Sequence, residues 1–381
     1  MRIAVIAPSH VPSNTANSIQ VMKVCQALAQ LGHAVCLWVP GEKTTPWEQL
    51  TDFYGVQTPF EIVWLPTQAR LKRYDLALSS VNRAVAWHAD AIYTWMPQAA
   101  VYGQLRGLPV VLEVHDRPTG KLGPWLLQRT VKMRGRKRLA VITLALVRVL
   151  EDEFGLHIPE ENLVIAPDAV DLERYEDLPD APAARLQLGL PPDQFTAIYT
   201  GHLYAGRGVE LLLGLARAFP QVHFLLVGGN PHSVENCRKQ VDQLGLANVT
   251  LTGFITNQKL ALYQAAGDIL LMPYGRMIAG SSGGNTADIC SPMKMFEYMA
   301  AGRAILSSDL PVLREVLNER NAVFCAADDL ESWKAGLQSL LDNPERMLVL
   351  GQQALKDAQP FSWKSRAALT LNNLVPERGQ E

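Results

Sequence analysis

Between two short apolar runs the chain carries the segment Ser291-Pro292-Met293-Lys294-Met295-Phe296-Glu297-Tyr298-Met299-Ala300-Ala301-Gly302. Serine is a common N-cap, proline is favoured at the first helical position and glycine often follows a helix end, so the spacing predicts a helix over 292–301. The runs Asp268–Met272 before it and Ala304–Ser307 after it have the length of buried strands. A strand, a helix and a second strand in this order predict a βαβ unit with parallel strands.

The same alternation continues along the chain in both directions. Further strands are predicted at Arg2–Ala7, Ala34–Val39, Glu61–Leu65, Ala91–Trp95, Val110–Val114, Val141–Leu144, Leu163–Ala166, Thr196–Thr200, His223–Val227, Val249–Thr252 and Ala322–Cys325, and helices at 18–31, 74–88, 208–219, 232–245, 257–266, 328–341, 344–357 and 362–373. The pattern stops between Pro167 and Pro192, where we place a domain boundary. We therefore expect two α/β domains with doubly wound parallel sheets, whose strand carboxyl ends bind ligands in a shared cleft.

Length and composition agree with this expectation. The 381 residues suffice for two domains, and a composition of 48% hydrophobic and 19% charged residues excludes disorder. A net charge of -2 gives no reason to expect a nucleic-acid partner. The five cysteines are scattered without metal-ligand spacing, no apolar run could span a bilayer, and the run Ile3–Ala7 is too short for a signal peptide. These features predict a cytoplasmic protein with reduced thiols.

The long loop after Met272 and the helix that it feeds are candidates for anion binding. Lys294 falls in the first helical turn, where the helix dipole disfavours a cation unless an anion is bound there. Free backbone N–H groups and an ammonium together suit a diphosphate. Glu297 lies one turn further and could accept hydrogen bonds from sugar hydroxyls. The alternative is an ordinary surface pair of Lys294 and Glu297.

A second candidate segment is Tyr199-Thr200-Gly201-His202-Leu203-Tyr204-Ala205-Gly206-Arg207-Gly208-Val209, which follows a strand and opens a helix. Its glycines would let the backbone approach a ligand, and the guanidinium of Arg207 could grip a diphosphate. A glycine-rich turn with an exposed arginine is the alternative. Both candidate segments leave the carboxyl ends of one predicted sheet, so together they predict a nucleotide pocket.

In the first predicted domain, His115 and Asp116 follow the strand Val110–Val114 and so also lie at a carboxyl end. His115 could meet a substrate in the cleft, and a turn histidine bonded to local backbone is the alternative. The loop Pro8–Ser18 after the first strand contains no glycine. The dinucleotide fingerprint G-x-G-x-x-G is therefore missing, which argues against a nicotinamide enzyme.

A basic segment follows His115. From Arg117 to Arg138 there are eight basic residues and no acidic one, with Trp125, Leu126 and Leu127 interleaved. This mixture is typical of a surface that contacts an anionic membrane or an anionic acceptor. A solvated run of charges is the alternative.

Several motifs together resemble the GT-B glycosyltransferases of family 4. They are Ser291-Pro292-x-Lys294-x-Phe296-Glu297-Tyr298-Met299-Ala300-x-Gly302 with Ser308-Asp309-Leu310-Pro311 (the donor-site helix), Tyr199-Thr200-Gly201-His202-Leu203-Tyr204 with Arg207-Gly208 (the phosphate loop), Pro167-Asp168-Ala169-Val170-Asp171 (the linker), His115-Asp116 (the active-site histidine) and Phe361-Ser362-Trp363 (the closing helix). Their order and spacing are more specific than any one of them.

The resemblance implies a GT-B fold with an acceptor-side domain at 1–168, a nucleotide-sugar domain at 169–360 and a closing segment at 361–381 that packs back on the first domain. It implies a retaining transfer, without a metal or other cofactor, from a nucleotide-diphosphate sugar to a saccharide or lipid acceptor in cell-envelope glycan or glycolipid synthesis, either free in the cytoplasm or peripherally on the inner face of the membrane.

The resemblance also implies roles for particular residues. Arg207 and Lys294 would stabilise the leaving diphosphate, Glu297 would bind the ribose hydroxyls, and His115 would contact the donor sugar near the reacting carbon. The remaining donor contacts would come from Gly201, His202, Gly253, Phe254, Ile255 and Ser291, and acceptor or loop contacts from Asn17, Ser18 and Asp116.

The chain departs from the family pattern at three places. Ile289, with Asp288 beside it, stands where the family carries the first of two glutamates that contact the donor. Asn17 and Ser18 take the place of the first-loop glycines, and His202 replaces a common arginine. Two other functions therefore stay open: a nucleotide-sugar epimerase of the same fold, and a catalytically silent partner that binds sugar or lipid.

Overall fold

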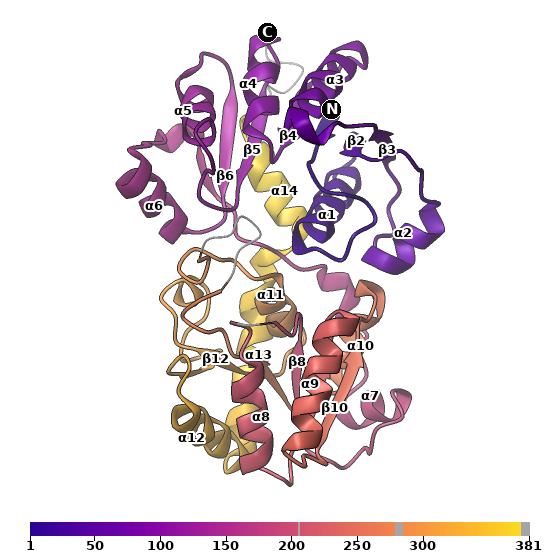
Figure 1. Ribbon diagram of the computed structural model, residues 1–381, viewed down its shortest axis with the longest axis vertical. Helices are drawn as coiled ribbons and strands as arrows, with labels where there is room; N and C mark the ends of the chain where they lie inside the picture. Colours follow the sequence, from indigo (N-terminus) through magenta and orange to yellow (C-terminus); the bar gives the residue numbers. More distant parts are fainter. Residues whose placement is uncertain (205, 279–284, 375–381) are drawn as a thin grey trace. The chain divides into compact units, whose positions relative to one another are not determined.

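The computed structural model describes residues 1–204, 206–278 and 285–374 (Figure 1). The chain forms two compact units. Unit 1 comprises Met1–Asp168 together with the segment that starts at Trp363, and unit 2 comprises Ala169–Ser362. Each unit is built around its own parallel sheet.

In its described part, unit 1 has a seven-stranded sheet in the order β3-β2-β1-β4-β5-β6-β7, in which every pair is parallel. The strands are β1 (Arg2–Ile6), β2 (Ala34–Pro40), β3 (Glu61–Leu65), β4 (Ala91–Thr94), β5 (Val110–Val114), β6 (Lys137–Val141) and β7 (Leu163–Ile165). The order reverses between β1 and β4. Such a switch point is where open α/β sheets usually bind ligands, outside the carboxyl ends of the strands.

Helices pack on this sheet because its central strands are apolar on both faces. They are α1 (Ala16–Gln30), α2 (Trp47–Tyr54), α3 (Tyr74–Ala86), α4 (Pro97–Leu105), α5 (Gly123–Lys132), α6 (Leu144–Phe154) and α14 (Trp363–Leu371). The last of these, α14, runs beside α1 although almost the whole chain separates them (Figure 1). The C-terminal helix is therefore an integral part of unit 1.

The described part of unit 2 has a six-stranded parallel sheet in the order β10-β9-β8-β11-β12-β13. Its strands are β8 (Thr196–Thr200), β9 (His223–Val227), β10 (Val249–Gly253), β11 (Ile269–Met272), β12 (Ala304–Ser308) and β13 (Val323–Cys325). Its helices are α7 (Ala181–Gln187), α8 (Val209–Ala218), α9 (Pro231–Gln243), α10 (Asn257–Ala265), α11 (Met293–Ala300), α12 (Leu330–Leu341) and α13 (Pro344–Ala358). The switch point here lies between β8 and β11, so the two candidate segments of unit 2 leave adjacent strands.

Two predictions about secondary structure are wrong in detail. The strand expected at Val141–Leu144 is β6, four residues earlier, and Leu144 begins α6 because Thr143 caps that helix by accepting from the N–H of Leu146 at 3.1 Å. The start of β6 was not predicted because it carries two charged residues. The ammonium of Lys137 donates to the carbonyl of Met133, and the guanidinium of Arg138 donates to the carbonyls of Asn372 and Glu161. Backbone acceptors thus let two cations enter a strand.

The second error concerns α11. Its N-cap is Pro292, without a side-chain cap hydrogen bond, so the helix begins at Met293 and not at the residue after Ser291. Gly302 follows the helix end at φ +65°, as the sequence predicts. None of the helices that the structure describes combines the length and apolarity needed to cross a bilayer.

Candidate active site

The loop between β8 and α8 depends on glycine because it packs against the chain that follows β11. A Cβ on Gly206 would clash with the carbonyl oxygen of Met277, and one on Gly208 with that of Pro273. Both glycines also have positive φ, 82° and 75°. The two segments that the sequence singles out are thus in contact. Two parts of them, residue 205 and residues 279–284, lie outside the described residues.

Arg207 is held in this contact by aromatic rings. Its Nη2 donates to the Tyr204 hydroxyl at 2.8 Å, and its guanidinium carbon lies 5.1 Å from the ring centroid of Tyr204 and 5.2 Å from that of Tyr274. Its Nε is buried and has no hydrogen-bond partner within the described part of the chain. The guanidinium is therefore oriented by cation–π contacts and keeps donors available for an anion.

Lys294 approaches the same rings from the first turn of α11. Its Nζ lies 4.0 Å from the ring centroid of Tyr199 and 5.3 Å from that of Tyr274. Gly201 has φ +144°, a conformation that favours glycine, and a Cβ there would come within 2.6 Å of this ammonium. Burial, and then the positive charge of Arg207, hold the pKa of Lys294 well below its usual range, while Glu297 acts in the opposite direction.

The two cations therefore form one cluster around Tyr274, and we call Arg207, Lys294, Tyr199, Tyr204 and Tyr274 the cation cluster. Among the described residues, neither Arg207 nor Lys294 has an ion pair with a carboxylate. Two half-buried basic groups without a counter-ion lose hydration and disfavour each other's charge, which is why the pKa of Lys294 is lowered. A bound polyanion would relieve both costs.

His202 flanks the cation cluster, where its imidazole stacks on Tyr204 with centroids 5.3 Å apart and its carbonyl accepts from the Tyr199 hydroxyl at 2.6 Å. Burial, and then the charges of Arg207 and Lys294, lower the pKa of this imidazole. His202 is therefore neutral at pH 7 and does not add a third charge where the family carries an arginine.

Glu297 lies one turn after Lys294 and is only 9% exposed. Its Oε2 accepts from Nε2 of Gln264 at 3.1 Å, and Gln264 in turn accepts from the Tyr175 hydroxyl at 2.7 Å. Within the described residues, Lys294 and Glu297 make no ion pair with each other. The alternative that they form an ordinary surface pair is wrong, because Glu297 is buried and Lys294 is half-buried.

The other expected donor contacts of unit 2 lie near strand ends or the helix start. Gly253 ends β10 at φ +72°, and its carbonyl accepts from the N–H of Gly228 at 2.9 Å. Phe254, which follows, is 45% exposed. Ser291 is buried just before α11. At the position of the absent first glutamate, Ile289 is fully buried, whereas Asp288 is exposed.

In unit 1, His115 lies just beyond β5 and is bonded to a buried carboxylate of that strand. Its Nε2 lies 2.8 Å from Oε2 of Glu113. Arg366 of α14 donates to both carboxylate oxygens of Glu113, at 2.6 and 2.7 Å. Burial would raise the pKa of Glu113, but Arg366 outweighs it and lowers that pKa to about 2. Ionised Glu113 can only accept, so Nε2 of His115 is the donor in this contact.

Gln20 lies beside His115 and bonds the last residue of the first segment of unit 1. Its Nε2 lies 3.2 Å from Nε2 of His115 and donates to Oδ1 of Asp168 at 2.8 Å, while its Oε1 accepts from the indole of Trp95 at 3.1 Å. Burial raises the pKa of Asp168 to about 6, against the lowering by His115 and Arg366. His115 thus sits in a hydrogen-bonded network whose members come from β5, α1, α14 and the end of unit 1, and the alternative of a histidine satisfied by local backbone does not describe it.

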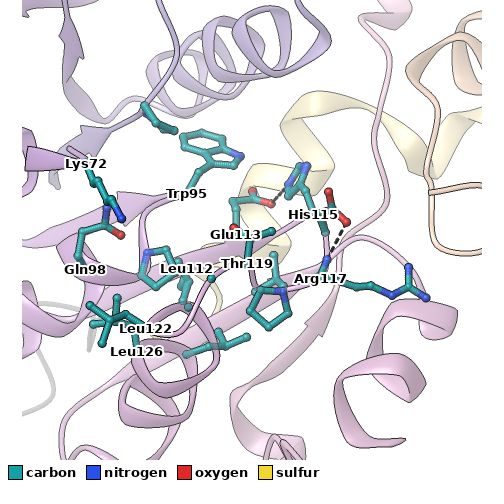
Figure 2. A pocket seen from close by; sticks show the side chains of 18 of the residues that line it. Lys72, Trp95, Gln98, Leu112, Glu113, His115, Arg117, Thr119, Leu122 and Leu126 are labelled. Atoms are coloured by element: carbon teal, nitrogen blue, oxygen red, sulfur yellow. Dashed lines mark hydrogen bonds and ion pairs between the residues drawn. The ribbon is translucent and has the colours of Figure 1, made fainter. Parts of the chain in front are cut away.

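A pocket of about 900 Å³ opens beside His115 within unit 1 (Figure 2). Asn17, His115, Asp116 and Arg117 line it. Of these, Asn17 accepts a hydrogen bond from the Ser9 hydroxyl. Ser18, an expected loop contact, is instead fully buried, where its hydroxyl bonds the His10 carbonyl and the Tyr54 hydroxyl. Ser18 therefore fixes the loop and is outside the pocket lining.

The family profile described as "Glycosyltransferase Family 4" matches residues 18–174, and that described as "Glycosyl transferases group 1" matches residues 194–343. Together the two matches cover most of both units. The chain belongs to family 4 of the GT-B glycosyltransferases.

Two relatives and one solved structure illustrate the likeness. A D-inositol 3-phosphate glycosyltransferase of Segniliparus rotundus is 28% identical over 57% of this chain and 50% of that protein. A phosphatidyl-myo-inositol mannosyltransferase of Mycolicibacterium smegmatis is 23% identical over 95% of this chain and 90% of that one. Alr3699/HepE of Anabaena, solved in complex with UDP-glucose, superposes with a TM-score of 0.72 at 17% identity, over 97% of this chain and 99% of that chain.

These matches confirm the GT-B fold and the family that the sequence motifs indicate. The chain spans only half the length of the Segniliparus relative, so that protein's substrates are a guide and not an assignment. None of the three proteins is named as an epimerase, and the comparisons give no support to that alternative.

The groups that hold His115 in this glycosyltransferase are not apparent from the sequence motifs. Glu113 lies two residues before it on β5, which is a usable signal, because side chains two apart on a strand point to the same face. Gln20, Asp168 and Arg366 carry no such signal. The role of the tyrosines in the cation cluster was also not predicted, although Tyr199, Tyr204 and Tyr274 all lie within the two candidate phosphate-binding segments.

Proposed function

We propose that this glycosyltransferase transfers a sugar from a nucleotide-diphosphate sugar with retention of configuration and without a metal. The observation that supports this most is the cation cluster, in which Arg207 and Lys294 share the ring of Tyr274 and have no carboxylate counter-ion within the described residues. A diphosphate supplies the negative charge that this arrangement needs. Retention rests on the resemblance of the donor-site motifs to those of retaining family 4 enzymes.

The chemistry follows from where charge develops. As the bond from the sugar to the diphosphate breaks, the sugar becomes oxocarbenium-like and negative charge collects on the leaving phosphate. Preorganised donors at that phosphate lower the barrier, and removal of one such donor typically costs about 10²–10³ in rate. Arg207 offers a planar fork of N–H groups, and Lys294 offers a compact ammonium from a helix start. Together they can neutralise charge as a divalent cation does in other transferases.

The remaining donor contacts complete this proposal. Oε1 of Glu297 has no partner among the described residues and can accept from the ribose hydroxyls, while Gln264 fixes the other oxygen. The exposed ring of Phe254 and the backbone of Gly253 and Ile255 would hold the base. In unit 1, His115 would contact the donor sugar through Nδ1, with its ring held by Glu113.

For the acceptor we propose a saccharide or lipid bound in the pocket of unit 1. The curated relatives include proteins named for inositol phosphate, for phosphatidyl-myo-inositol and for a glycosyldiacylglycerol product, and these names support a proposed reaction in glycan or glycolipid synthesis. Asn17 and Asp116 line this pocket and are proposed acceptor contacts.

We further propose that the protein binds anionic membrane surfaces peripherally through α5. Leu122 and Trp125, each 56% exposed, and the exposed Arg129 and Lys132 recur at helical spacing, so an apolar edge and two cations share one face. Arg134 and Arg136 are exposed just beyond it. Arg117 belongs to a different group, since it pairs with Glu153 at 3.1 Å.

The test of donor binding is a thermal-shift screen with UDP-, GDP-, ADP- and TDP-sugars. A ligand that binds only the folded state raises its stability, so the true donor should raise Tm in a concentration-dependent way, equally with EDTA and with Mg²⁺. The anomeric configuration of the product then reports retention. Slow donor hydrolysis that Glu297→Ala abolishes would exclude a catalytically silent protein. No shift with any of the four donors would count against the proposed function.

Membrane binding is tested separately by sedimentation with vesicles. Simultaneous Arg129→Gln, Lys132→Gln, Arg134→Gln and Arg136→Gln changes should release the protein from phosphatidylglycerol vesicles, because each juxtamembrane cation contributes about 1 kcal/mol. Phosphatidylcholine vesicles serve as the uncharged control. Unchanged sedimentation of the fourfold variant would refute the surface contact.

A further inference from the structure

The pocket of unit 1 has mainly apolar walls. Trp95 lies on one side, Leu112 lies at the base, and Leu122 and Leu126 lie on the opposite side, at the start of α5 (Figure 2). His115 and its partner Glu113 occupy one end, and Lys72 and Gln98 the other (Figure 2). A bare sugar would leave most of this apolar wall without a matching group, so the shape favours a molecule with an apolar part.

The charges that line the pocket do not balance. Lys72 and Lys121 are exposed lining residues, and neither makes a hydrogen bond or ion pair within the part of the chain that the structure describes. Glu113 is paired with Arg366, and Asp116 accepts from the backbone N–H of Arg117 at 2.8 Å. The two lysines therefore outnumber the carboxylate of Asp116, and the lining carries a net positive charge.

The backbone at Lys72 adds an independent observation. Lys72 and Arg73 have φ of 46° and 69°, a left-handed conformation that side-chain-bearing residues seldom adopt. Two such residues in succession carry a conformational cost, which persists only where the surroundings enforce it and which clusters at binding sites. Here the turn lies just before α3 and directs Lys72 to the pocket (Figure 2).

We propose that this pocket binds an anionic amphiphile, with a phosphate between Lys72 and Lys121 and an apolar chain along Trp95, Leu122 and Leu126. A volume of about 900 Å³ is near the upper end for a drug-sized ligand, so it accommodates a headgroup and the first part of a chain. The rest of the chain would leave over the exposed Leu122. The identity of this molecule as the acceptor rests on the proposed function, whereas its binding does not.

Binding is measured by isothermal titration calorimetry with three probes below their micellar concentrations. Octyl phosphate carries both the anion and the chain, octyl glucoside carries the chain alone, and inorganic phosphate carries the anion alone. We expect octyl phosphate to bind at least ~10-fold more tightly than either other probe, because it buries apolar surface and pairs with ammonium groups. Raising the salt concentration should weaken octyl phosphate and leave octyl glucoside unchanged.

Variants locate the binding. Lys72→Gln and Lys121→Gln should each weaken octyl phosphate by roughly 3- to 10-fold, as expected for partly exposed charge pairs, without changing octyl glucoside. Leu122→Gln should weaken both octyl compounds and leave inorganic phosphate unchanged. Lys43→Gln is the matched control, because this exposed lysine of the same unit lies outside the pocket lining.

The outcomes separate this proposal from the proposed function. Equal affinities for octyl phosphate and octyl glucoside, or unchanged binding by Lys72→Gln and Lys121→Gln, would overturn the anionic-amphiphile pocket even if a nucleotide sugar raises Tm through unit 2. Octyl phosphate binding that is lost in these variants would support the pocket even if every donor screen failed. The same nucleotide screen on each variant shows that unit 2 is intact.

Discussion

The guanidinium of Arg366 forms a bidentate pair with the carboxylate of Glu113, in which it donates to the two oxygens at 2.6 and 2.7 Å, although the two residues are 253 positions apart. Arg366 also donates to the carbonyls of Pro167 at 2.8 Å and Ala166 at 3.0 Å, at the end of β7. Both side chains are buried. One arginine thus ties the closing helix α14 to the strand that carries His115 and to the last residues of unit 1.

We predict that Arg366→Met destabilises unit 1 by about 3–5 kcal/mol, because it leaves the carboxylate of Glu113 buried without its cation. Urea unfolding at pH 7 measures this. Adding Glu113→Gln to Arg366→Met should recover part of the loss, because the remaining group is then neutral. The control is Arg314→Met, which removes an exposed arginine paired with Asp309 and should cost below about 1 kcal/mol. Equal losses in the two single variants would show that the buried pair is not special.

A second prediction concerns the pH dependence of stability at Asp168. Its pKa in the folded protein is raised to about 6, above the ordinary value of 3.8, so the folded state holds this proton more tightly than the unfolded state. The stability that the protonated group contributes is complete below pH 3.8 and is lost as pH rises through 6. Asp168→Asn should therefore stabilise the protein by about 2 kcal/mol at pH 7.5 and by little at pH 3.5.

The opposite sign is expected at Asp309, which is the control for this experiment. Its hydrogen bond with Arg314 lowers the pKa of that carboxyl, so the pair stabilises the folded state above the ordinary pKa and the contribution is lost as pH falls. Asp309→Asn should thus be neutral or slightly destabilising at pH 7.5. If Asp168→Asn behaves in the same way, the buried carboxyl is compensated by its partners.

Much of the fold, but not the tertiary contacts between side chains, could be predicted from the sequence. The βαβ pattern predicted nearly all strands of both sheets, because strands buried on both faces read as continuous apolar runs. It placed β6 wrongly, because Lys137 and Arg138 are satisfied by backbone carbonyls that no local pattern reveals. The pairing of Glu113 with Arg366 is a tertiary contact, so nothing near either residue announces it.

The candidate site was likewise predictable in part: its segments were predicted from the sequence, and its tertiary contacts were not. The rule that ligands bind at carboxyl strand ends predicted that Arg207 and Lys294 lie at the same edge of one sheet, and in the structure both contact the ring of Tyr274. The rule does not explain how the two cationic side chains are stabilised there without a carboxylate partner among the described residues. They are stabilised by the tyrosine rings, whose faces attract cations but whose spacing has no period.

For the cation cluster we predict that Arg207→Ala and Lys294→Ala each raise the barrier of donor turnover by about 2–4 kcal/mol, because each removes charge stabilisation from the leaving diphosphate. Steady-state hydrolysis or transfer of the donor measures kcat and KM. The loss should fall mainly in kcat, since the charge develops in the transition state.

The matched control for these variants is Lys259→Ala, which removes an exposed lysine of α10 in the same unit. It should leave turnover unchanged, while thermal unfolding confirms that all three variants fold. Activity that survives both Arg207→Ala and Lys294→Ala would place the diphosphate elsewhere.

The lowered pKa of Lys294 leads to a prediction about chemical reactivity. Burial and the charge of Arg207 favour the neutral amine, and a neutral amine is nucleophilic where an ordinary lysine is still protonated. Brief treatment with an acylating reagent at pH 8, followed by peptide mass spectrometry, should therefore modify Lys294 ahead of exposed lysines such as Lys259. A bound nucleoside diphosphate should slow the modification, because its phosphates cover the amine and restore the ammonium by raising its pKa.

If the pKa is lowered through Arg207, Arg207→Met should bring the reactivity of Lys294 towards that of Lys259, whereas Tyr204→Phe, which keeps the aromatic ring, should change it less. Modification of Lys294 at the same rate as Lys259 in the unliganded protein, or modification that nucleotide does not slow, would mean that the amine is not the desolvated diphosphate contact that the structure indicates.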